Sequence, residues 1–292
     1  MDRGRALIIG GDSPIGAAMC AHLAAAGFSI VKTTRRKERV NEETLYLDLE
    51  SLDGMKDLPA CGWTVLVASE TRFAECERDP EYSDKVNRYS PVEIGRHVET
   101  LGSRVLFFSS IAVHDGASEC PGEDLKPSPN SLYGRQKRNA EMGLMAALSN
   151  VVIIRPSKVI IPHFSMFDQW CGELQAGRPI TPFKDMLVAP VWLDTLADAC
   201  ARLVTAADVA GIYQLSAQRQ ISYADIAAHL AAAYGYDQEL LHPVYAREKL
   251  PSGISWLPKF ATLGCERLQA ATGVIPPEPE AAIDGYIDDG GA

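Results

Sequence analysis

The sequence predicts an α/β fold in which a doubly wound parallel sheet is followed by a smaller C-terminal substrate-binding lobe. Short apolar runs in the first 156 residues alternate with helical stretches, which is typical of strands buried on both faces of a parallel sheet. Beyond Pro156 the residues Pro, Phe and Trp occur without a clear period. The expected strands are Ala6–Ile9, Phe28–Thr34, Thr44–Leu47, Val65–Ala68, Arg104–Phe108 and Val151–Ile154.

The change of character after Pro156 suggests how the chain is divided. Val188–Val191 and Gly211–Leu215 have the composition of strands, and we expect both to return to the main sheet. An alanine-rich helix is expected from Ile221 onward. The two parts expected are a main domain of residues 1–156 and about 186–216, and a lobe of residues 157–185 and 217–292.

Composition and charge exclude several classes of protein. The 292 residues are 47% hydrophobic and 23% charged, with a net charge of −10, which argues against a general nucleic-acid binder. No stretch approaches the roughly 18 apolar residues that a membrane span needs. The seven cysteines contain no Cys-x-x-Cys pair, which indicates reduced thiols, no metal site and a cytoplasmic location.

A glycine-bearing turn joins the first expected strand to the first expected helix. Gly10, Ser13 and Gly16 have the spacing of a dinucleotide-binding fingerprint, and Pro14 suits the first helical position. Gly10 permits the tight turn, and Gly16 permits close helix–sheet packing. The helix N-terminus, from Ser13 to Ile15, offers N–H groups to a pyrophosphate. Ser13 replaces the middle glycine, and its hydroxyl could donate a hydrogen bond to phosphate. An ordinary turn with incidental glycines is the alternative.

The residues after the second expected strand indicate which dinucleotide is bound. An NAD site usually has Asp or Glu about 20 residues after the glycine turn, where it binds the ribose 2′-hydroxyl. Arg35, Arg36 and Lys37 stand there instead, and arginine can hold a 2′-phosphate in fork geometry. We therefore expect NADP rather than NAD, with a solvated basic loop as the alternative. Asp48 and Leu49 occupy a place where adenine is often held, although Asp48 could equally face solvent.

A serine, a tyrosine and a lysine further along fit proton transfer to a carbonyl oxygen. Ser110 follows the fifth strand at the sheet edge where ligands bind in open α/β sheets. Tyr133 and Lys137 lie four residues apart on an expected helix over Tyr133–Leu148, so their side chains share one face. A protonated lysine beside a phenol lowers the phenol's pKa, and such a tyrosine can exchange a proton with an alcohol or ketone near neutral pH.

Several further segments point to one family. They are Thr71–Pro80, Asn87, Phe108–Ser110, Tyr133–Lys137, Arg155–Ser157 and Pro190–Asp194. On these motifs the chain resembles the extended short-chain dehydrogenase/reductase superfamily over nearly its whole length, and most closely its dTDP-4-dehydrorhamnose reductase-like branch. The resemblance implies a Rossmann fold and an NAD(P)-dependent reductase or epimerase.

The resemblance also implies roles for individual residues. Ser110 would polarise the substrate oxygen, Tyr133 would act as acid and base, and Lys137 would bind the nicotinamide ribose. Asn87 would support the active site from a neighbouring helix. The remaining residues expected to line the cofactor are Ala68, Ser69 and Pro156.

The chain departs from the family pattern where the substrate would bind. Ile111-Ala112 stand where the related sugar dehydratases carry Asp-Glu, which argues against dehydratase chemistry. Lys158 stands where rhamnose-type reductases usually place a tryptophan against the sugar. A cation there would favour a substrate with a carboxylate, a phosphate or several hydroxyls, and a lysine directed to solvent is the alternative.

Two other side-chain types could contact the substrate. His114 stands where the family usually has an aromatic residue, although a loop histidine is more often solvated. Trp192, like Trp170 and Trp256, could stack on a sugar or base, although large aromatics more often belong to the core. The substrate-binding residues expected are therefore Ser110, His114, Lys158 and Trp192.

Two functions from different classes are left open. The leading hypothesis is an NADP-dependent oxidoreductase that reduces a nucleotide sugar or related small carbonyl compound, or epimerises it through a keto intermediate. The alternative is a non-catalytic NAD(P)-binding regulatory or partner subunit, because fold alone does not imply activity. The intact Ser110, Tyr133 and Lys137 favour the enzyme. The expected partner is a small-molecule substrate, without nucleic acid or membrane, and homodimer formation is left open.

Overall fold

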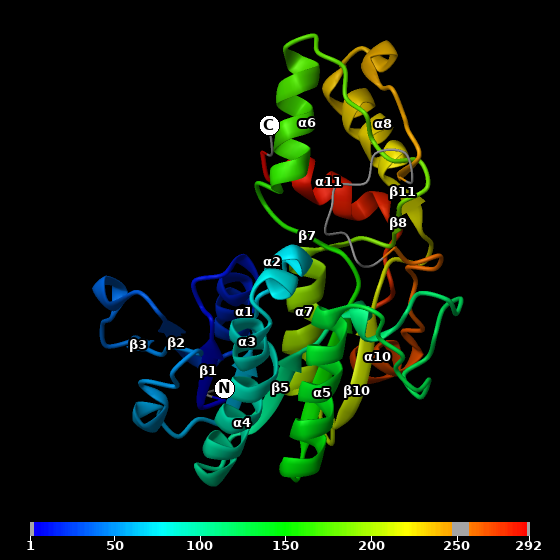
Figure 1. Ribbon diagram of the computed structural model, residues 1–292. Coiled ribbons are helices and arrows are strands. Elements are labelled where there is room, and N and C mark those ends of the chain that lie inside the picture. The colour runs from blue at the N-terminus through cyan, green and yellow to red at the C-terminus, as the bar shows by residue number, and fades with distance from the viewer. Residues whose placement is uncertain (1–2, 247–256, 291–292) are drawn as a thin grey trace.

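A parallel sheet lies at the centre of the computed structural model, which describes residues 3–246 and 257–290 (Figure 1). Its strands are ordered β10-β6-β5-β4-β1-β2-β3, and every neighbouring pair is parallel, which confirms the doubly wound sheet. The winding reverses between β1 and β4, and ligands bind at such switch points. The strands are β1 (Arg5–Ile9), β2 (Ser29–Thr34), β3 (Thr44–Tyr46), β4 (Trp63–Leu66), β5 (Arg104–Phe108), β6 (Val151–Pro156) and β10 (Gly211–Leu215).

Helices cover both faces of this sheet because successive residues of a buried strand point to opposite sides. Ala6 and Ile8 of β1 belong to the core under α1, α7 and α10, whereas Leu7 and Ile9 belong to the core under α4 and α5. The helices of the first face are α1 (Pro14–Ala25), α7 (Leu193–Thr205) and α10 (Glu266–Thr272). Those of the second are α4 (Ser90–Thr100) and α5 (Leu132–Ala147), with α2 (Phe73–Arg78) and α3 (Pro80–Asp84) preceding α4.

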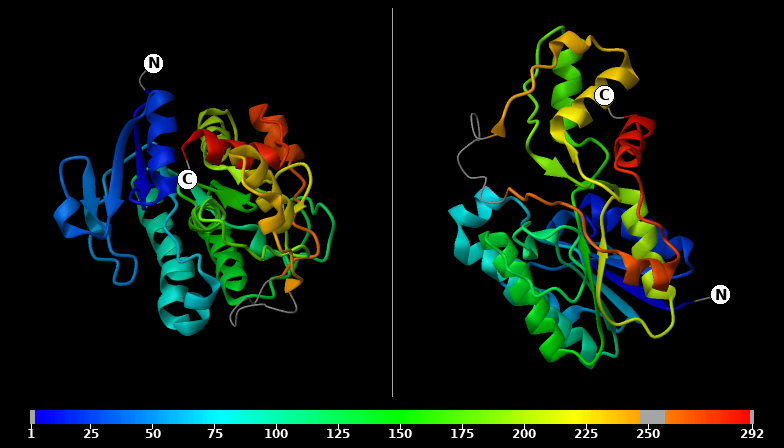
Figure 2. Two further views of the ribbon diagram at one scale, coloured as in Figure 1. Left: turned by 90° about the horizontal axis from the view of Figure 1, so that it is seen from above. Right: turned by 90° about the vertical axis from the view of Figure 1, so that its right-hand side faces the viewer.

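A smaller lobe stands at one end of the sheet (Figures 1 and 2). Its core is aromatic: the ring of Phe167 meets that of Tyr286 edge-on, with centroids 5.2 Å apart, and Ile226 and Leu230 pack in the same cluster. The helices of the lobe are α6 (Ser165–Gln175), α8 (Tyr223–Tyr234) and α11 (Glu280–Asp288). Its short strands pair as β7 (Val159–Ile160) with β9 (Val191–Trp192), and β8 (Leu187–Val188) with β11 (Ile221–Ser222).

Two segments of the chain lie elsewhere than the sequence predicts. The exact bounds of the two domains stay a prediction. Gly211–Leu215 joins the main sheet as predicted, but Val188–Val191 does not, because its residues fall in β8 and β9. Pro190 separates these two-residue strands and has no N–H for a ladder. Helix α10 lies in the range assigned to the lobe, yet its Leu268 packs under the main sheet. The seven cysteines are free thiols, as expected.

A π-helical segment, Lys85–Tyr89, joins α3 to α4. It contains Asn87, whose side chain is fully buried. Such π segments are frequent at functional sites. The remaining short elements are 3₁₀ turns at Lys37–Arg39, Met55–Asp57, Ile111–Val113 and Gln238–Leu240.

One buried ion pair links α5 to the sheet. Arg155 of β6 donates from Nε and Nη2 to the two carboxylate oxygens of Glu141 at 2.8 and 2.7 Å, and neither residue is exposed. Ser109, just after β5, donates a third hydrogen bond to Glu141. Tyr133, Lys137 and Glu141 follow one another at four-residue intervals on one face of α5. The ion pair therefore also sets the position of Tyr133 and Lys137 relative to β5.

We expect Glu141→Gln to lower the free energy of unfolding by about 3–5 kcal/mol, because it leaves the buried Arg155 charge without a counter-ion. Urea denaturation followed by circular dichroism measures this loss. The matched control is Asp198→Asn, which breaks the exposed Asp198–Arg202 pair of α7 and should cost less than about 1 kcal/mol. Equal losses in the two variants would show that the buried pair contributes no more than a surface pair.

Candidate active site

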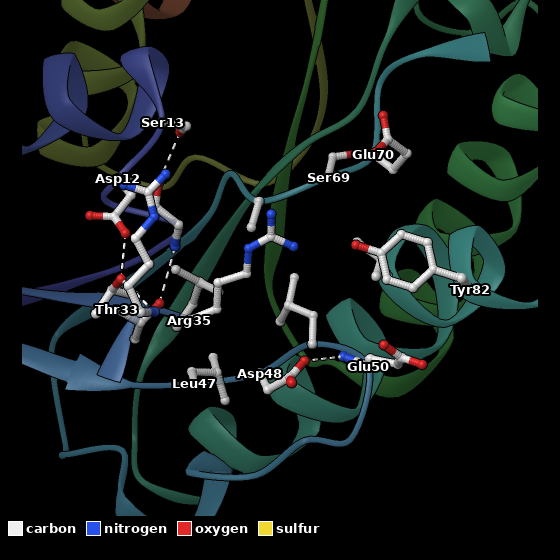
Figure 3. A pocket seen from close by; sticks show the side chains of 17 residues that line it. Asp12, Ser13, Thr33, Arg35, Leu47, Asp48, Glu50, Ser69, Glu70 and Tyr82 are labelled. Carbon is white, nitrogen blue, oxygen red and sulfur yellow. Dashed lines mark hydrogen bonds between the residues drawn. The ribbon is translucent and has the colours of Figure 1, made fainter. Parts of the chain in front are cut away.

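Two adjoining cavities lie at the carboxyl edge of the sheet, at the switch point between β1 and β4. The first, of about 350 Å³, opens between the ends of β1 and β2 and the loop after β3 (Figure 3). The second, of about 640 Å³, lies between the sheet edge and the lobe. The predicted residues that line the first are Gly10, Ser13, Arg35, Arg36, Asp48, Leu49, Ala68 and Ser69. Those that line the second are Ser13, Pro14, Ile15, Ala68, Ser69, Ser110, Tyr133, Lys137, Pro156 and Lys158.

The glycine turn has the geometry that the fingerprint predicts. Gly10 has a φ of +92°, and a Cβ there would meet Ala68 Cβ at 2.7 Å. A Cβ on Gly16 would lie 2.2 Å from the Gly10 carbonyl oxygen. Ser13 differs from the expectation: its hydroxyl donates to the Gly10 carbonyl at 2.8 Å and accepts from Gly16 N–H at 3.0 Å. Ser13 therefore caps the N-terminus of α1. Because its hydroxyl proton is already donated within the turn, only the backbone N–H groups remain to bind a phosphate.

Two arginines at the end of β2 supply positive charge to the first cavity. Figure 3 shows the Arg35 side chain reaching into this cavity. Neither Arg35 nor Arg36 forms an ion pair within residues 3–246 and 257–290, although Arg35 lowers the pKa of Glu70 and Arg36 that of Asp12 through their charge. Lys37, the third predicted cation, lies with Nζ 5.2 Å from the ring centroid of Tyr46 and does not line the cavity.

Three of the four acidic side chains that line the same cavity are engaged locally. Asp12 accepts from the Thr34 hydroxyl, and this hydrogen bond is the main reason that its pKa is lowered. Asp48 accepts from the Glu50 N–H at 2.8 Å. Glu70 is held by Arg72, whose backbone N–H, Nε and Nη2 donate three hydrogen bonds to its carboxylate. Sequence reasoning missed Asp12 and Glu70. Asp12 stands inside the glycine turn, which was the one signal that could have found it.

Tyr133 and Lys137 lie together in the second cavity, but their charges differ from the expectation. Burial raises the pKa of Tyr133 to about 12, against the smaller effect of a hydrogen bond with Ser110. Burial also lowers the pKa of Lys137 to about 7, while Nζ donates to the Phe108 carbonyl at 2.7 Å. Nζ lies 6.0 Å from the Tyr133 ring centroid. The predicted lowering of the tyrosine pKa by the lysine is therefore wrong, because burial raises the pKa of Tyr133 and also moves Lys137 toward its neutral form. Tyr133 is a protonated phenol at neutral pH.

Asn87 supports the site through a fully used side-chain amide. Its Oδ1 accepts from the Ser69 hydroxyl and the Glu70 N–H, both at 2.8 Å. Its Nδ2 donates to the Glu70 carbonyl and to Gln136 Oε1, both at 2.9 Å. Because Ser69 gives its only proton to Asn87, it can accept but not donate toward Tyr133, which again favours the protonated phenol. Gln136 had no signal in the sequence apart from its place between Tyr133 and Lys137.

His114 and Trp192, two of the predicted substrate residues, line neither cavity. The His114 ring is buried with Nε2 3.4 Å from Gln214 Oε1, and burial lowers its pKa. Trp192 packs against α11, where a Cβ on Gly285 would lie 2.6 Å from the indole. Trp170 belongs to the lobe's aromatic cluster. Trp256 lies outside the described residues.

The buried lysine should make stability depend on pH in a specific direction. Lys137 has an ordinary pKa of 10.5 when unfolded and about 7 when folded, so folding is penalised at pH values below 10.5 and most at pH 7 and lower. Relative to the wild type, Lys137→Met should therefore gain free energy of unfolding as the pH falls from 10 to 7. Urea denaturation at several pH values measures this trend. Lys126→Met, at an exposed position, should show no trend, and a flat difference for Lys137→Met would mean that the lysine titrates normally.

Neither a membrane-spanning helix nor a cluster of metal-binding side chains is found in the part of the chain that the structure describes. The polar groups of the two cavities are hydroxyls, amides, carboxylates, two arginines and two lysines. They can therefore bind an anionic dinucleotide and move a proton.

Comparisons with known proteins agree with this geometry. The dTDP-4-dehydrorhamnose reductase of Sinorhizobium fredii is 26% identical over 227 residues, which are 74% of this chain and 76% of that enzyme. Other reductases of that name are matched over 57% of their length. The structure of the dTDP-4-dehydrorhamnose reductase from Bacillus anthracis in complex with NADP has a TM-score of 0.85, with 16% identity and coverage of 99% of this chain and 100% of that one.

A second solved structure, MoeE5 in complex with UDP-glucose and NAD, has a TM-score of 0.83 at 19% identity, and the match covers 98% of each chain. At these identities the two structural likenesses show the fold alone. The sequence itself matches the family described as RmlD substrate binding domain over residues 4–291. This chain therefore belongs to the RmlD substrate-binding domain family, within the extended short-chain dehydrogenase/reductase superfamily.

Proposed function

We propose that the protein is an NADPH-dependent reductase of a keto group on a nucleotide sugar or a related small carbonyl compound. The observation that carries this proposal is the meeting of Ser110, Tyr133 and Lys137 in a cavity that adjoins the one lined by Arg35 and Arg36. Relatives named dTDP-4-dehydrorhamnose reductase and a structural neighbour that binds NADP support the cofactor and the substrate class.

The two cavities offer a site of suitable chemistry for NADPH, which when bound would supply a hydride to the carbonyl carbon. Gly10 lets the turn approach Ala68 closely, and the first turn of α1 would bind the pyrophosphate. Arg35 and Arg36 would hold the 2′-phosphate, and the absence of a direct ion pair to either one among the described residues fits that role. Asp48 and Leu49 would lie by the adenine, and Ala68, Ser69 and Pro156 would line the path to Lys137 at the nicotinamide ribose.

The side chains of the second cavity fit the protonation of a developing alkoxide. Tyr133 carries its proton at neutral pH and would donate it to the substrate oxygen. The Ser110 oxygen accepts from Ala112 N–H, so the hydroxyl proton remains to bind the substrate oxygen or the phenolate left behind. Oxidation, or epimerisation that begins with oxidation, would need Tyr133 as a phenolate at the outset, which its burial disfavours. The protonated phenol and the relatives named as reductases both support reduction as the proposed direction.

NADPH should bind at least about tenfold more tightly than NADH, because two charge-assisted contacts to the 2′-phosphate are absent with NADH. Replacing Arg35 and Arg36 with Ala should remove this preference and leave NADH affinity within a few-fold of the wild type. Isothermal titration calorimetry measures both affinities. The control replaces Lys56 and Lys126, two exposed lysines that line neither cavity, with Ala. Equal affinities of the wild type for NADPH and NADH would refute the assignment of NADP as the cofactor.

Tyr133→Phe keeps the ring and removes the proton, so kcat should fall by about 10²–10⁴-fold while NADPH affinity changes little. The assay follows NADPH oxidation across a panel of nucleotide-activated keto sugars and simpler carbonyl compounds. Near-normal turnover by Tyr133→Phe would refute its role as proton donor. If the wild type binds NADPH but oxidises it with no compound of the panel, the non-catalytic alternative is favoured instead.

A further inference from the structure

The second cavity has a wall that carries positive but no negative charge. Its described lining includes Lys137 and Lys158, and no Asp or Glu. This is unusual in a chain with a net charge of −10, and it differs from the first cavity, where Asp12, Asp48 and Glu70 accompany the arginines. Lys137 donates one hydrogen bond to the Phe108 carbonyl, and the proposed function assigns its remaining donors to the nicotinamide ribose. Lys158 is therefore the cation that this wall leaves for a ligand.

Lys158 is partly buried and has no anionic partner among the described residues. Its ammonium group makes no hydrogen bond or ion pair with any residue in the described ranges. Its contact is with Phe164, whose ring centroid lies 4.8 Å from Nζ. Burial lowers the pKa of Lys158, and no neighbouring acid opposes that shift. An uncompensated cation beside a cavity is costly to maintain and is a common mark of a binding site.

Tyr223 brings a second unused donor to the same cavity. It is the first residue of α8, and its side chain is 9% exposed. Its ring meets Trp170 edge-on at 6.2 Å, while its hydroxyl has no hydrogen-bond partner among the residues the structure covers. Tyr223 and Phe164, the ring under Lys158, belong to one aromatic cluster of the lobe. Burial raises the pKa of Tyr223 to about 12, so its hydroxyl remains a donor.

We propose that Lys158 and Tyr223 form a subsite for a carboxylate carried by the sugar ring of the substrate. This inference rests on the proposed function and narrows its substrate class to nucleotide sugars of the uronic acid type. The lysine supplies the counter-charge and the tyrosine a hydrogen bond, which together suit the two oxygens of a carboxylate. The diphosphate of the nucleotide is the other anionic source that could occupy such a subsite.

The place of Lys158 along the chain favours the ring over the diphosphate. Phe108 of β5 pairs with Ile154 of β6, so Ser110 and Pro156, each two residues further, leave the sheet side by side. Lys158 follows Pro156 by two residues, which is roughly 7 Å of chain. It therefore starts close to the hydroxyls of the reacting centre, within reach of a group on the same sugar ring. A diphosphate would lie on the far side of that ring.

The experiment compares two ligands that differ only in this group. Calorimetry on the NADP⁺-bound protein measures binding of UDP-glucuronic acid and UDP-glucose, of the corresponding dTDP sugars, and of UDP and dTDP alone. In the wild type the uronic ligand should bind at least about tenfold more tightly than its hydroxymethyl counterpart. Lys158→Met should abolish this ratio, Lys158→Arg should retain part of it, and Tyr223→Phe should reduce it a few-fold. Lys126→Met is the matched control and should leave the ratio unchanged.

The outcomes separate this inference from the function on which it rests. If the wild type does not bind NADP⁺, that result counts against the proposed function itself. With NADP⁺ bound, equal or weaker binding of both uronic ligands, or no binding of either, overturns the carboxylate subsite. A loss of affinity for UDP or dTDP alone in Lys158→Met, equal to the loss for the uronic sugars, would assign Lys158 to the diphosphate and also overturn it.

Discussion

The buried contact between Glu141 and Arg155 is the constraint on which the rest of the site depends. It joins α5 to β6, and Ser109 extends it to the end of β5. These three elements carry Tyr133, Lys137, Ser110 and Pro156 to one cavity. A buried salt bridge contributes little net stability, because the free energy needed to remove two charges from water offsets much of their attraction. The pair serves to position α5, because its two parallel hydrogen bonds fix where the helix lies along β6.

The same removal from water sets the proton chemistry of the site. Tyr133 and Lys137 both move toward their neutral forms, since a charge is disfavoured where little solvent reaches. The hydrogen bond that the Ser69 hydroxyl donates to Asn87 Oδ1 acts in the same direction, because Ser69 can then only accept a hydrogen bond from Tyr133. Both groups are therefore held in their neutral forms at neutral pH, which for Tyr133 is the protonated phenol.

Much of the fold could be predicted from the sequence, because buried parallel strands are marked by continuous apolar runs and glycine turns. For that reason the sequence predicts the strands from β1 to β6. The helix is predicted by the four-residue spacing of Tyr133 and Lys137. The strand partners of Val188 and Val191 could not be predicted in this way. Each residue belongs to a two-residue strand, and such strands depend on partners distant in sequence. The roles of the site residues stay predictions. The spacing of Tyr133 and Lys137 could bring them together but could not reveal how deeply both are buried, and Tyr223 comes from a segment without any motif.

The path of the chain between sheet and lobe limits how the molecule can be divided. After β6 the chain enters the lobe, returns to the sheet for α7 and β10, enters the lobe again for α8, and returns for α10 before it ends in α11 (Figure 1). A cut after Pro156 would remove β10 and expose the edge of β6, an open strand edge that invites aggregation. The lobe, for its part, is assembled from three separate stretches of the chain, and its one aromatic core forms only when all three are present. Neither half is therefore one continuous segment that could be cut out of the chain, and a replacement of the lobe alone would need three separate exchanges.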